Sequence, residues 1–142
     1  MLVLDTNIIS EFLRPIMAAS VDRWLKTVDY SEIFLTATTV AEVLYGIARM
    51  PEGRRKREAT DAIHGILAAL AERLVPFDAE SAVHYADIVS KRESMGRRVS
   101  VSDGQITAIC RQHGATLATR NVKDFLHTGV ELVNPWEVDV VS

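Results

Sequence analysis

The chain lacks the residue patterns of several common enzyme classes. Among its 142 residues are only 7 glycines, and they form neither a glycine-rich phosphate loop nor a GxSxG nucleophile elbow. The 4 histidines are scattered without the spacing of metal ligands. No apolar run is long enough to cross a bilayer, and no cleavable signal pattern precedes the first apolar segment. These absences argue against P-loop, serine-hydrolase and histidine–zinc chemistry, and against a membrane protein.

Cysteine and excess positive charge are also scarce. Cys110 is the only cysteine, which excludes an intramolecular disulfide and fits a reducing cytoplasm. It shares a helical face with Ile106 and Ile109, so we expect a buried, unreactive thiol. The 16 Lys and Arg residues against 19 Asp and Glu give a formal net charge of −3. A chain with this balance would bind nucleic acid only through local basic patches or bound cations.

The order of apolar segments predicts an α/β fold. The length suits one compact core, and we place a single domain at residues 1–138 with a C-terminal tail at 139–142. Short apolar segments alternate with segments of helical periodicity, which indicates a parallel sheet with helices on both faces. The first segment, Leu2–Leu4, has no polar residue and is typical of a strand buried on both faces. The predicted strands are 2–4, 33–37, 74–77, 115–119 and 131–133.

Acidic residues occur where a parallel sheet gathers its ligands. Asp5 directly follows the first strand, and Glu42, Asp103 and the segment 121–124 each lie at the end of a strand or the start of a helix. Because the carboxyl ends of parallel strands share one edge, we expect these side chains in one cleft. Converging carboxylates repel one another and have raised pKa values, a conflict that a bound hard cation removes. The pattern therefore points to metal-assisted phosphoryl chemistry.

The first two of these carboxylates also have local structural explanations. An aspartate at a strand end, such as Asp5, is usually a turn or helix-capping residue. Thr39 and Glu42 have the spacing of a capping box, in which the glutamate bonds back to the amide of the capping residue. Neither explanation excludes a functional role, but for Glu42 the local sequence alone favours capping.

The later acidic residues have similar explanations. Asp103 falls in the first turn of a predicted helix, where a carboxylate complements the helix dipole. Ser102, which we expect to start that helix, forms a second potential capping box with Gln105. Asp124 is placed to cap a short helix that Phe125 begins. The coincidence of all these positions at one sheet edge favours a site.

Five segments, in this order and spacing, carry a resemblance to a known family. They are Leu4–Glu11, Thr39–Gly46, Val101–Ala108, Leu117–Phe125 and Val133–Trp136. Together they resemble the PIN-domain family, specifically the VapC and FitB type toxins of bacterial toxin–antitoxin pairs. The resemblance covers nearly the whole chain. It implies a three-layer α/β/α PIN-like domain with a mostly parallel sheet of four to five strands.

The resemblance implies a ribonuclease that depends on Mg²⁺ or Mn²⁺. Asp5, Glu42 and Asp103 match the family's three most regular acidic positions and would hold the metal. The family often has a fourth acidic residue where this chain has Asn121, and Asp124 follows three residues later. Either would complete the catalytic set. A water activated by metal would attack the phosphodiester in line and leave a 5′ phosphate and a 3′ hydroxyl.

Neighbouring hydroxyls and cations extend the predicted site. Thr6 resembles a family hydroxyl that orients Asp5 or a metal-bound water, and Ser102 would act in the same way near Asp103. Basic residues at or near the same edge are candidates for binding RNA against the repulsion of the acidic cleft, although each is also explained as a solvated surface cation. They are Arg97, Arg98, Arg120 and Lys123.

The resemblance also implies partners. Besides an RNA substrate, we expect a homodimer and a small cognate antitoxin whose C-terminal segment lies across the cleft. DNA would be contacted only through the antitoxin, and no membrane would be involved. The alternative is a catalytically weak PIN-fold binding module that serves within an antitoxin–DNA repressor complex, with Asn121 marking a weakened site. A signalling receiver domain would need paired acidic residues and a late lysine, and neither is evident.

Overall fold

The centre of the structure is the short strand β1 (Leu2–Leu4). It pairs in parallel with β2 (Ile33–Thr36) on one side and with β4 (Thr116–Ala118) on the other. β3 (Leu74–Val75) and β5 (Glu131–Val133) extend the sheet at its two edges. The sheet therefore has the order β3-β2-β1-β4-β5 and is parallel throughout, which confirms the predicted parallel sheet of four to five strands.

The structure is a computed structural model that describes residues 1–138, and the tail predicted at 139–142 lies outside the described residues. The first and last strands have the predicted bounds, whereas β2, β3 and β4 are shorter than the sequence predicts. The third strand ends at Val75 because the next residue, Pro76, has no N–H to continue the ladder. No helix of the described range is long and apolar enough to cross a membrane.

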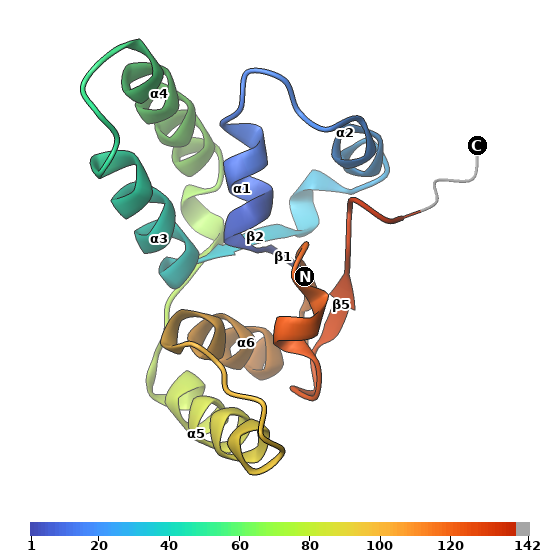
Figure 1. Cartoon of the computed structure of the whole chain (residues 1–142). Coiled ribbons are helices and arrows are strands. Elements are labelled where there is room, and N and C mark those ends of the chain that lie inside the picture. The colour runs from blue at the N-terminus through green and yellow to red at the C-terminus, as the bar shows by residue number, and fades with distance from the viewer. Residues whose placement is uncertain (139–142) are drawn as a thin grey trace.

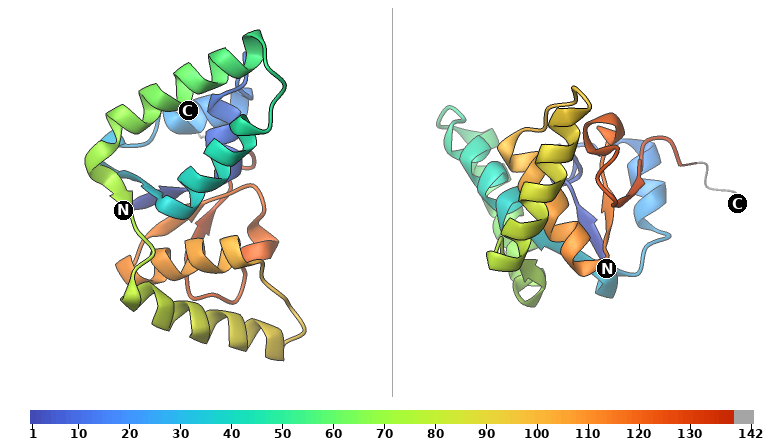
Figure 2. Two further views of the ribbon diagram at one scale, coloured as in Figure 1. Left: turned by 90° about the vertical axis from the view of Figure 1, so that its left-hand side faces the viewer. Right: turned by 90° about the horizontal axis from the view of Figure 1, so that it is seen from below.

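Helices cover both faces of the sheet in two layers (Figures 1 and 2). One layer holds α1 (Thr6–Phe12), α2 (Ala19–Leu25), α3 (Ala37–Ala48) and α4 (Arg54–Ala69). The other holds α5 (Ala79–Ser94) and α6 (Val101–His113). Short 3-10 helices at Tyr30–Glu32, Ala71–Arg73 and Val122–Phe125 connect these elements. The arrangement confirms the predicted three-layer α/β/α fold.

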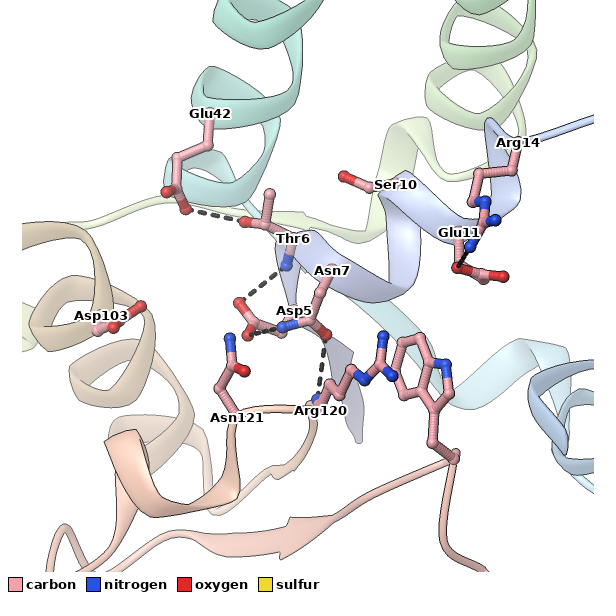
Figure 3. A pocket seen from close by; sticks show the side chains of 11 residues that line it. Asp5, Thr6, Asn7, Ser10, Glu11, Arg14, Glu42, Asp103, Arg120 and Asn121 are labelled. Atoms are coloured by element: carbon pink, nitrogen blue, oxygen red, sulfur yellow. Dashed lines mark hydrogen bonds and ion pairs between the residues drawn. The ribbon is translucent and has the colours of Figure 1, made fainter. Parts of the chain in front are cut away.

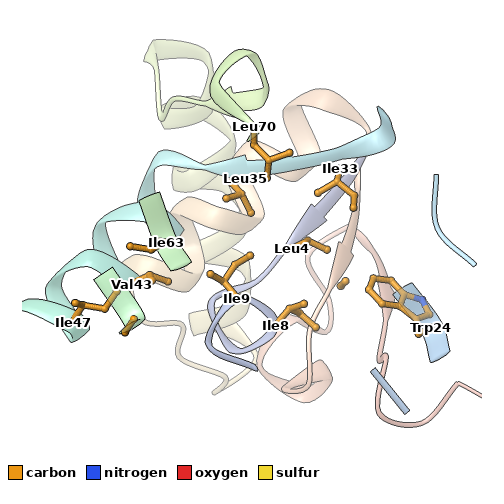
Figure 4. Packing of buried hydrophobic residues seen from close by; sticks show 12 residues of the cluster. Leu4, Ile8, Ile9, Trp24, Ile33, Leu35, Val43, Ile47, Ile63 and Leu70 are labelled. Carbon is orange, nitrogen blue, oxygen red and sulfur yellow. The ribbon is translucent and has the colours of Figure 1, made fainter. Parts of the chain in front are cut away.

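Successive strand residues enter two separate cores. Leu4 packs with Leu35 and Ile9 in the larger core, beneath the layer of α1 to α4 (Figure 4). Val3 points the other way and packs with Leu117 against α6. This alternation follows from the period of two in a strand, and it explains why β1 has no polar residue.

The single thiol lies in the smaller core. Cys110 on α6 is fully buried beside Val3 and Leu117. Burial, with a smaller contribution from the charge of Asp5, raises the pKa of this thiol to about 12. A thiol with that pKa is almost entirely protonated near neutral pH, so the prediction of an unreactive cysteine is confirmed.

The start of α3 differs from the predicted capping box. The capping residue is Thr36, whose Oγ1 accepts a hydrogen bond of 3.0 Å from the N–H of Thr39. Because Thr36 is also the last residue of β2, the strand passes into the helix without a loop. The capping-box prediction for Glu42 was therefore wrong, and its carboxylate is left to make another contact.

The start of α6 differs in the same way. Ser100, not Ser102, caps the helix by accepting a hydrogen bond of 3.1 Å from the N–H of Asp103. Gln105 does not bond back to the helix start, and its Oε1 instead accepts a hydrogen bond of 3.0 Å from the hydroxyl of Thr38 on α3. The predicted Ser102–Gln105 capping box was wrong, whereas Asp103 does lie in the first helical turn, as predicted.

α5 and α6 pack closely because the contact contains a glycine. A Cβ built on Gly104 would lie 2.7 Å from Cε2 of Tyr85 and 3.1 Å from Cγ2 of Val89. In contrast, a Cβ on Gly65, in the interior of α4, would meet no atom within 4 Å. Gly104 thus lets the helix that carries Asp103 approach α5.

We expect alanine to have opposite effects at these two glycines. Gly65→Ala should raise the free energy of unfolding by about 1 kcal/mol through helix propensity. Gly104→Ala gains the same propensity but must displace Tyr85, an overpacking cost of about 1–3 kcal/mol. Urea unfolding of the two variants should therefore differ by at least about 1 kcal/mol. Equal stabilisation at both positions would contradict the close approach of α5 and α6.

Candidate active site

The strand order of the sheet reverses direction at β1. From this strand the chain continues to β2 and β3 on one side, and only later adds β4 and β5 on the other. In parallel sheets, ligands bind at the carboxyl ends of the strands where such a reversal opens a crevice. Asp5 follows β1 and Thr119 follows β4, so both lie at this point.

Asp5 is held by hydrogen bonds from two sides of the reversal. Its Oδ1 accepts from the N–H of Thr6 at 2.8 Å, which makes it the N-cap of α1. Its Oδ2 accepts from Asn7 Nδ2 at 3.0 Å and from the hydroxyl of Thr119 at 2.8 Å. Burial raises the pKa of Asp5, and these hydrogen bonds offset part of the rise. A carboxylate has about four acceptor positions, so roughly one remains for a ligand.

Glu42 is fixed by the residue next to Asp5. The hydroxyl of Thr6 donates a hydrogen bond of 2.8 Å to Oε1 of Glu42, which projects from α3 (Figure 3). Thr6 therefore binds both carboxylates, Asp5 through its backbone N–H and Glu42 through its side chain. The sequence predicted that the Thr6 hydroxyl orients Asp5 or a metal-bound water, and the structure shows it bonded to Glu42.

Asp103 completes an acidic group from three different elements. Its pKa is raised to about 6, first by burial and then by the negative charges of Asp5, Glu42 and Asp124. The other carboxylates therefore lie close enough to Asp103 to disfavour its charged form, in agreement with the predicted convergence at one edge.

A cleft of about 470 Å³ contains most of the predicted site. In Figure 3, Asp103 and Glu42 lie on one side of Asp5 and the two arginines on the other, so the cleft has an acidic half and a basic half. Its lining residues are Asp5, Thr6, Asn7, Ser10, Glu11, Arg14, Glu42, Asp103, Arg120, Asn121 and Trp136.

Other predicted residues lie off the wall of this cleft. Asp124 is exposed and lies inside the 3-10 helix at Val122–Phe125, so the prediction that it caps a helix was wrong. Its charge nevertheless contributes to the raised pKa of Asp5 and of Asp103, which places it near the site. The remaining residues off the wall are Ser102, Arg97, Arg98 and Lys123.

Six side chains of the site were not found from the sequence. Asn7 and Thr119 bond to Asp5, and the other four line the cleft: Ser10, Glu11, Arg14 and Trp136. Trp136 follows β5, so the same rule that gathered the acidic residues at the carboxyl edge of the sheet could have located it. The contact between Thr119 and Asp5 spans 114 positions of the chain and has no local signal.

The acidic group offers the oxygen donors that a hard cation prefers, but its side chains are not arranged as a complete set of metal ligands. Among residues 1–138, no set of three or more His, Cys, Asp and Glu side chains has the arrangement to hold a metal ion. Mg²⁺ usually takes one or two carboxylates and keeps several waters, so it needs no such set. Carboxylate oxygens of Asp5, Glu42 and Asp103, with the amide oxygen of Asn121, fit this mode of binding.

Comparison with known proteins places the chain among related sequences and structures. The profile of the PIN domain matches residues 2–130. The chain is 37% identical over 138 residues to VapC ribonuclease Y4jK of Sinorhizobium fredii and 38% identical over 137 residues to Toxin FitB of Neisseria gonorrhoeae. Each alignment covers 96% of this chain and 99% of the relative.

Solved structures agree with the sequence relatives. The crystal structure of FitAcB from Neisseria gonorrhoeae superposes with a TM-score of 0.91 at 37% identity, over 97% of this chain and 100% of that one. A structure of FitAB bound to an IR36 DNA fragment gives the same TM-score and identity, over 99% of both chains.

The raised pKa of Asp103 predicts a pH-dependent gain in stability for Asp103→Asn. In the folded wild type the Asp103 carboxyl keeps its proton up to about pH 6, whereas in the unfolded chain it loses the proton at about pH 3.8. The free energy of unfolding of the wild type therefore falls as the pH rises between these two values. In EDTA at pH 8, the variant should be about 1–2 kcal/mol more stable than wild type, and the difference should vanish near pH 4.

The control for this measurement is Asp61→Asn, at an exposed position of α4. It should change the free energy of unfolding little at either pH. If Asp103→Asn behaves like this control at pH 8, the proposed repulsion among the cleft carboxylates is wrong.

Proposed function

The chain belongs to the PIN-domain family, and on that premise we propose that it is a divalent-metal-dependent endoribonuclease toxin controlled by a cognate antitoxin. It is of the VapC/FitB type, and one relative of similar length is named a ribonuclease and another a toxin. The observation that carries the proposal is the wall of the cleft. There Asp5, Glu42 and Asp103 come from three elements, and the charges of Asp5 and Glu42 contribute to the raised pKa of Asp103.

The proposed roles of the chain's own residues follow from their contacts. Asp5, Glu42 and Asp103 would hold Mg²⁺ or Mn²⁺, and PIN-domain ribonucleases generally use divalent metal ions. When bound, such a cation supplies charge neutralisation and activation of a water for in-line attack on a phosphodiester. Thr6 keeps Glu42 in position, and Asn121 offers an amide oxygen at the same wall.

The proposal extends to the fourth polar position. Asn121 lines the cleft, whereas Asp124 lies off its wall and acts on the site through its charge. We therefore assign the direct contact to Asn121 and a supporting electrostatic role to Asp124. The products would carry a 5′ phosphate and a 3′ hydroxyl.

The partners are part of the same proposal. Toxin FitB is a relative of this chain, and similar solved structures include FitAcB and FitAB bound to a DNA fragment. This chain would likewise pair with a cognate antitoxin, form a homodimer, and contact DNA only through the antitoxin. A cationic antitoxin side chain would be stabilised by the acidic half of the cleft.

One observation favours a second function. Asn121 lines the cleft at the position where the family often has a fourth acidic residue. A catalytically weak binding module within an antitoxin–DNA repressor complex would have this feature. Cleavage measurements separate the two functions.

We expect purified, antitoxin-free protein to cleave total or transfer RNA with Mg²⁺ or Mn²⁺ and not with EDTA. Asp5→Asn should lower the rate by about a hundredfold or more, because it removes a charged ligand from the centre of the site. Asp61→Asn should cleave like wild type. Cutting that survives EDTA or Asp5→Asn would place the activity elsewhere. A folded, metal-binding protein that cuts no RNA would favour the binding module.

Thr6 provides a more specific test of the geometry. Thr6→Val removes the hydroxyl that bonds to Glu42 but keeps the backbone N–H that bonds to Asp5. Cleavage should fall about 10- to 100-fold, the usual effect of losing a residue that orients a metal ligand. Thr6→Ser keeps the hydroxyl and should stay near the wild-type rate. Equal activity of the two variants would show that the Thr6–Glu42 bond has no role in cleavage.

A further inference from the structure

The basic half of the cleft contains an arginine held against an aromatic ring. The guanidinium carbon of Arg120 lies 5.0 Å from the ring centroid of Trp136, and both residues line the cleft that holds the three carboxylates. We propose that this Arg120–Trp136 pair is a subsite that binds a phosphate of the RNA flanking the phosphate to be cut. The proposal rests on the proposed ribonuclease function and assigns Trp136 a role in substrate positioning.

The position of Arg120 is set by the same residue that holds Asp5. Asn7 donates through Nδ2 to Oδ2 of Asp5, at 3.0 Å, and accepts through Oδ1 from the backbone N–H of Arg120, at 3.1 Å. The side chain of Asn7 therefore fixes the distance between the carboxylate of Asp5 and the backbone of Arg120. A subsite for a neighbouring phosphate needs such a fixed offset.

A second asparagine joins Arg120 to the tryptophan. Asn134 donates through Nδ2 to the backbone oxygen of Arg120 at 3.4 Å and accepts through Oδ1 from the N–H of Trp136 at 3.0 Å. The loops after β4 and β5 are thereby held together where the two side chains meet. The pair is thus anchored through its backbone on both sides.

Arg120 differs from the other arginine of the cleft in its charge partners. Arg14 forms an ion pair of 3.3 Å with the buried carboxylate of Glu11, which reduces its attraction for another anion. Among the ion pairs of residues 1–138, none involves Arg120. Arg120 is also exposed, so its N–H groups are accessible to a ligand.

The chemistry of the pair favours a phosphate. The guanidinium carbon lies over the indole ring, and the N–H donors along the edges of a guanidinium match phosphate oxygens. Figure 3 places Arg120 on the side of Asp5 away from Glu42 and Asp103, so the cation lies beside the acidic centre rather than within it. A cation there offsets the repulsion that an acidic cleft exerts on a polyanion.

The test measures RNA binding without cleavage. The parent is Asp103→Asn in Mg²⁺, because this change leaves the hydrogen bonds of Asp5, Asn7 and Arg120 in place. Its affinity for a fluorescein-labelled single-stranded RNA of mixed sequence is followed by anisotropy at several salt concentrations. Adding Arg120→Gln should weaken binding about tenfold and reduce the slope of log K against log salt by about 0.7, the value for one phosphate contact.

The tryptophan variants separate positioning from charge. Trp136→Leu keeps the cation, so most of the salt slope should remain, but affinity should fall several-fold because the guanidinium is no longer held. Trp136→Phe keeps an aromatic face and should restore part of the affinity. Arg120→Lys keeps the charge but loses the planar fork, and should lie between the parent and Arg120→Gln.

The chain offers a matched control outside the cleft. The guanidinium carbon of Arg49 lies 5.4 Å from the ring centroid of Tyr45, in the last turns of α3, and neither residue lines the cleft. Arg49→Gln removes the same charge from a similar pair, and should leave affinity and salt slope near those of the parent.

Two results would overturn the inference. The first is that adding Arg120→Gln to the Asp103→Asn parent weakens RNA binding no more than adding Arg49→Gln does. The second is that the Asp103→Asn parent itself does not bind RNA. A Trp136→Leu variant that lowers only the melting temperature would make that residue structural. Cleavage by wild type is measured separately, so a wild type that cuts RNA while Arg120→Gln binds normally refutes the subsite and leaves the ribonuclease intact.

Discussion

The structure depends on the hydrogen bonding of one buried carboxylate. Asp5 is 4% exposed, and its oxygens accept hydrogen bonds from the start of α1 and from Thr119 after β4. Because β1 is central, these bonds join the two halves of the sheet at the point where its strand order reverses. Thr6 and Asn7 extend the same group of bonds to Glu42 and to Arg120. Glu42 in the acidic half and Arg120 in the basic half are therefore both bonded to a single three-residue segment.

The acidic cleft is a local cost to stability that the rest of the fold offsets. Burial and the charges of neighbouring carboxylates raise the pKa values of Asp5 and Asp103, and neutral donors rather than cations bond to the buried carboxylate of Asp5. Such unfavourable charge is common at functional sites, where binding of a ligand repays it. Two apolar cores, one on each face of the sheet, supply the compensating burial. A metal ion or a cationic side chain of an antitoxin would relieve this repulsion, whereas the phosphates of RNA would add to it. The effects of these ligands on stability and activity are therefore coupled through this one group of carboxylates.

Much of the fold and the acidic centre could be predicted, because both depend on simple rules of sheet geometry. Apolar strands without alternation indicated a buried parallel sheet, and the shared carboxyl edge brought Asp5, Glu42, Asp103 and Asn121 to one cleft. Local rules failed where tertiary contacts competed with them. The spacing of Thr39 and Glu42 matched a capping box, but Thr36 from the preceding strand took the capping role. The contact between Trp136 and Arg120 joins two different loops and cannot be predicted from the sequence around either residue. The shared carboxyl edge of the parallel strands nevertheless places both residues in the same region.

The passage from β2 into α3 without a loop has a consequence for how such proteins can change in length. Thr36 ends the strand and Ala37 begins the helix, so the register of the sheet also sets the rotation of α3 about its axis. One inserted residue at this junction would turn the helix by about 100° and carry Glu42 away from Thr6. Asp5, between β1 and α1, is subject to the same restriction. Insertions and deletions should therefore accumulate in connections such as the one that follows α3, while the junctions that carry Asp5 and Glu42 keep a fixed length.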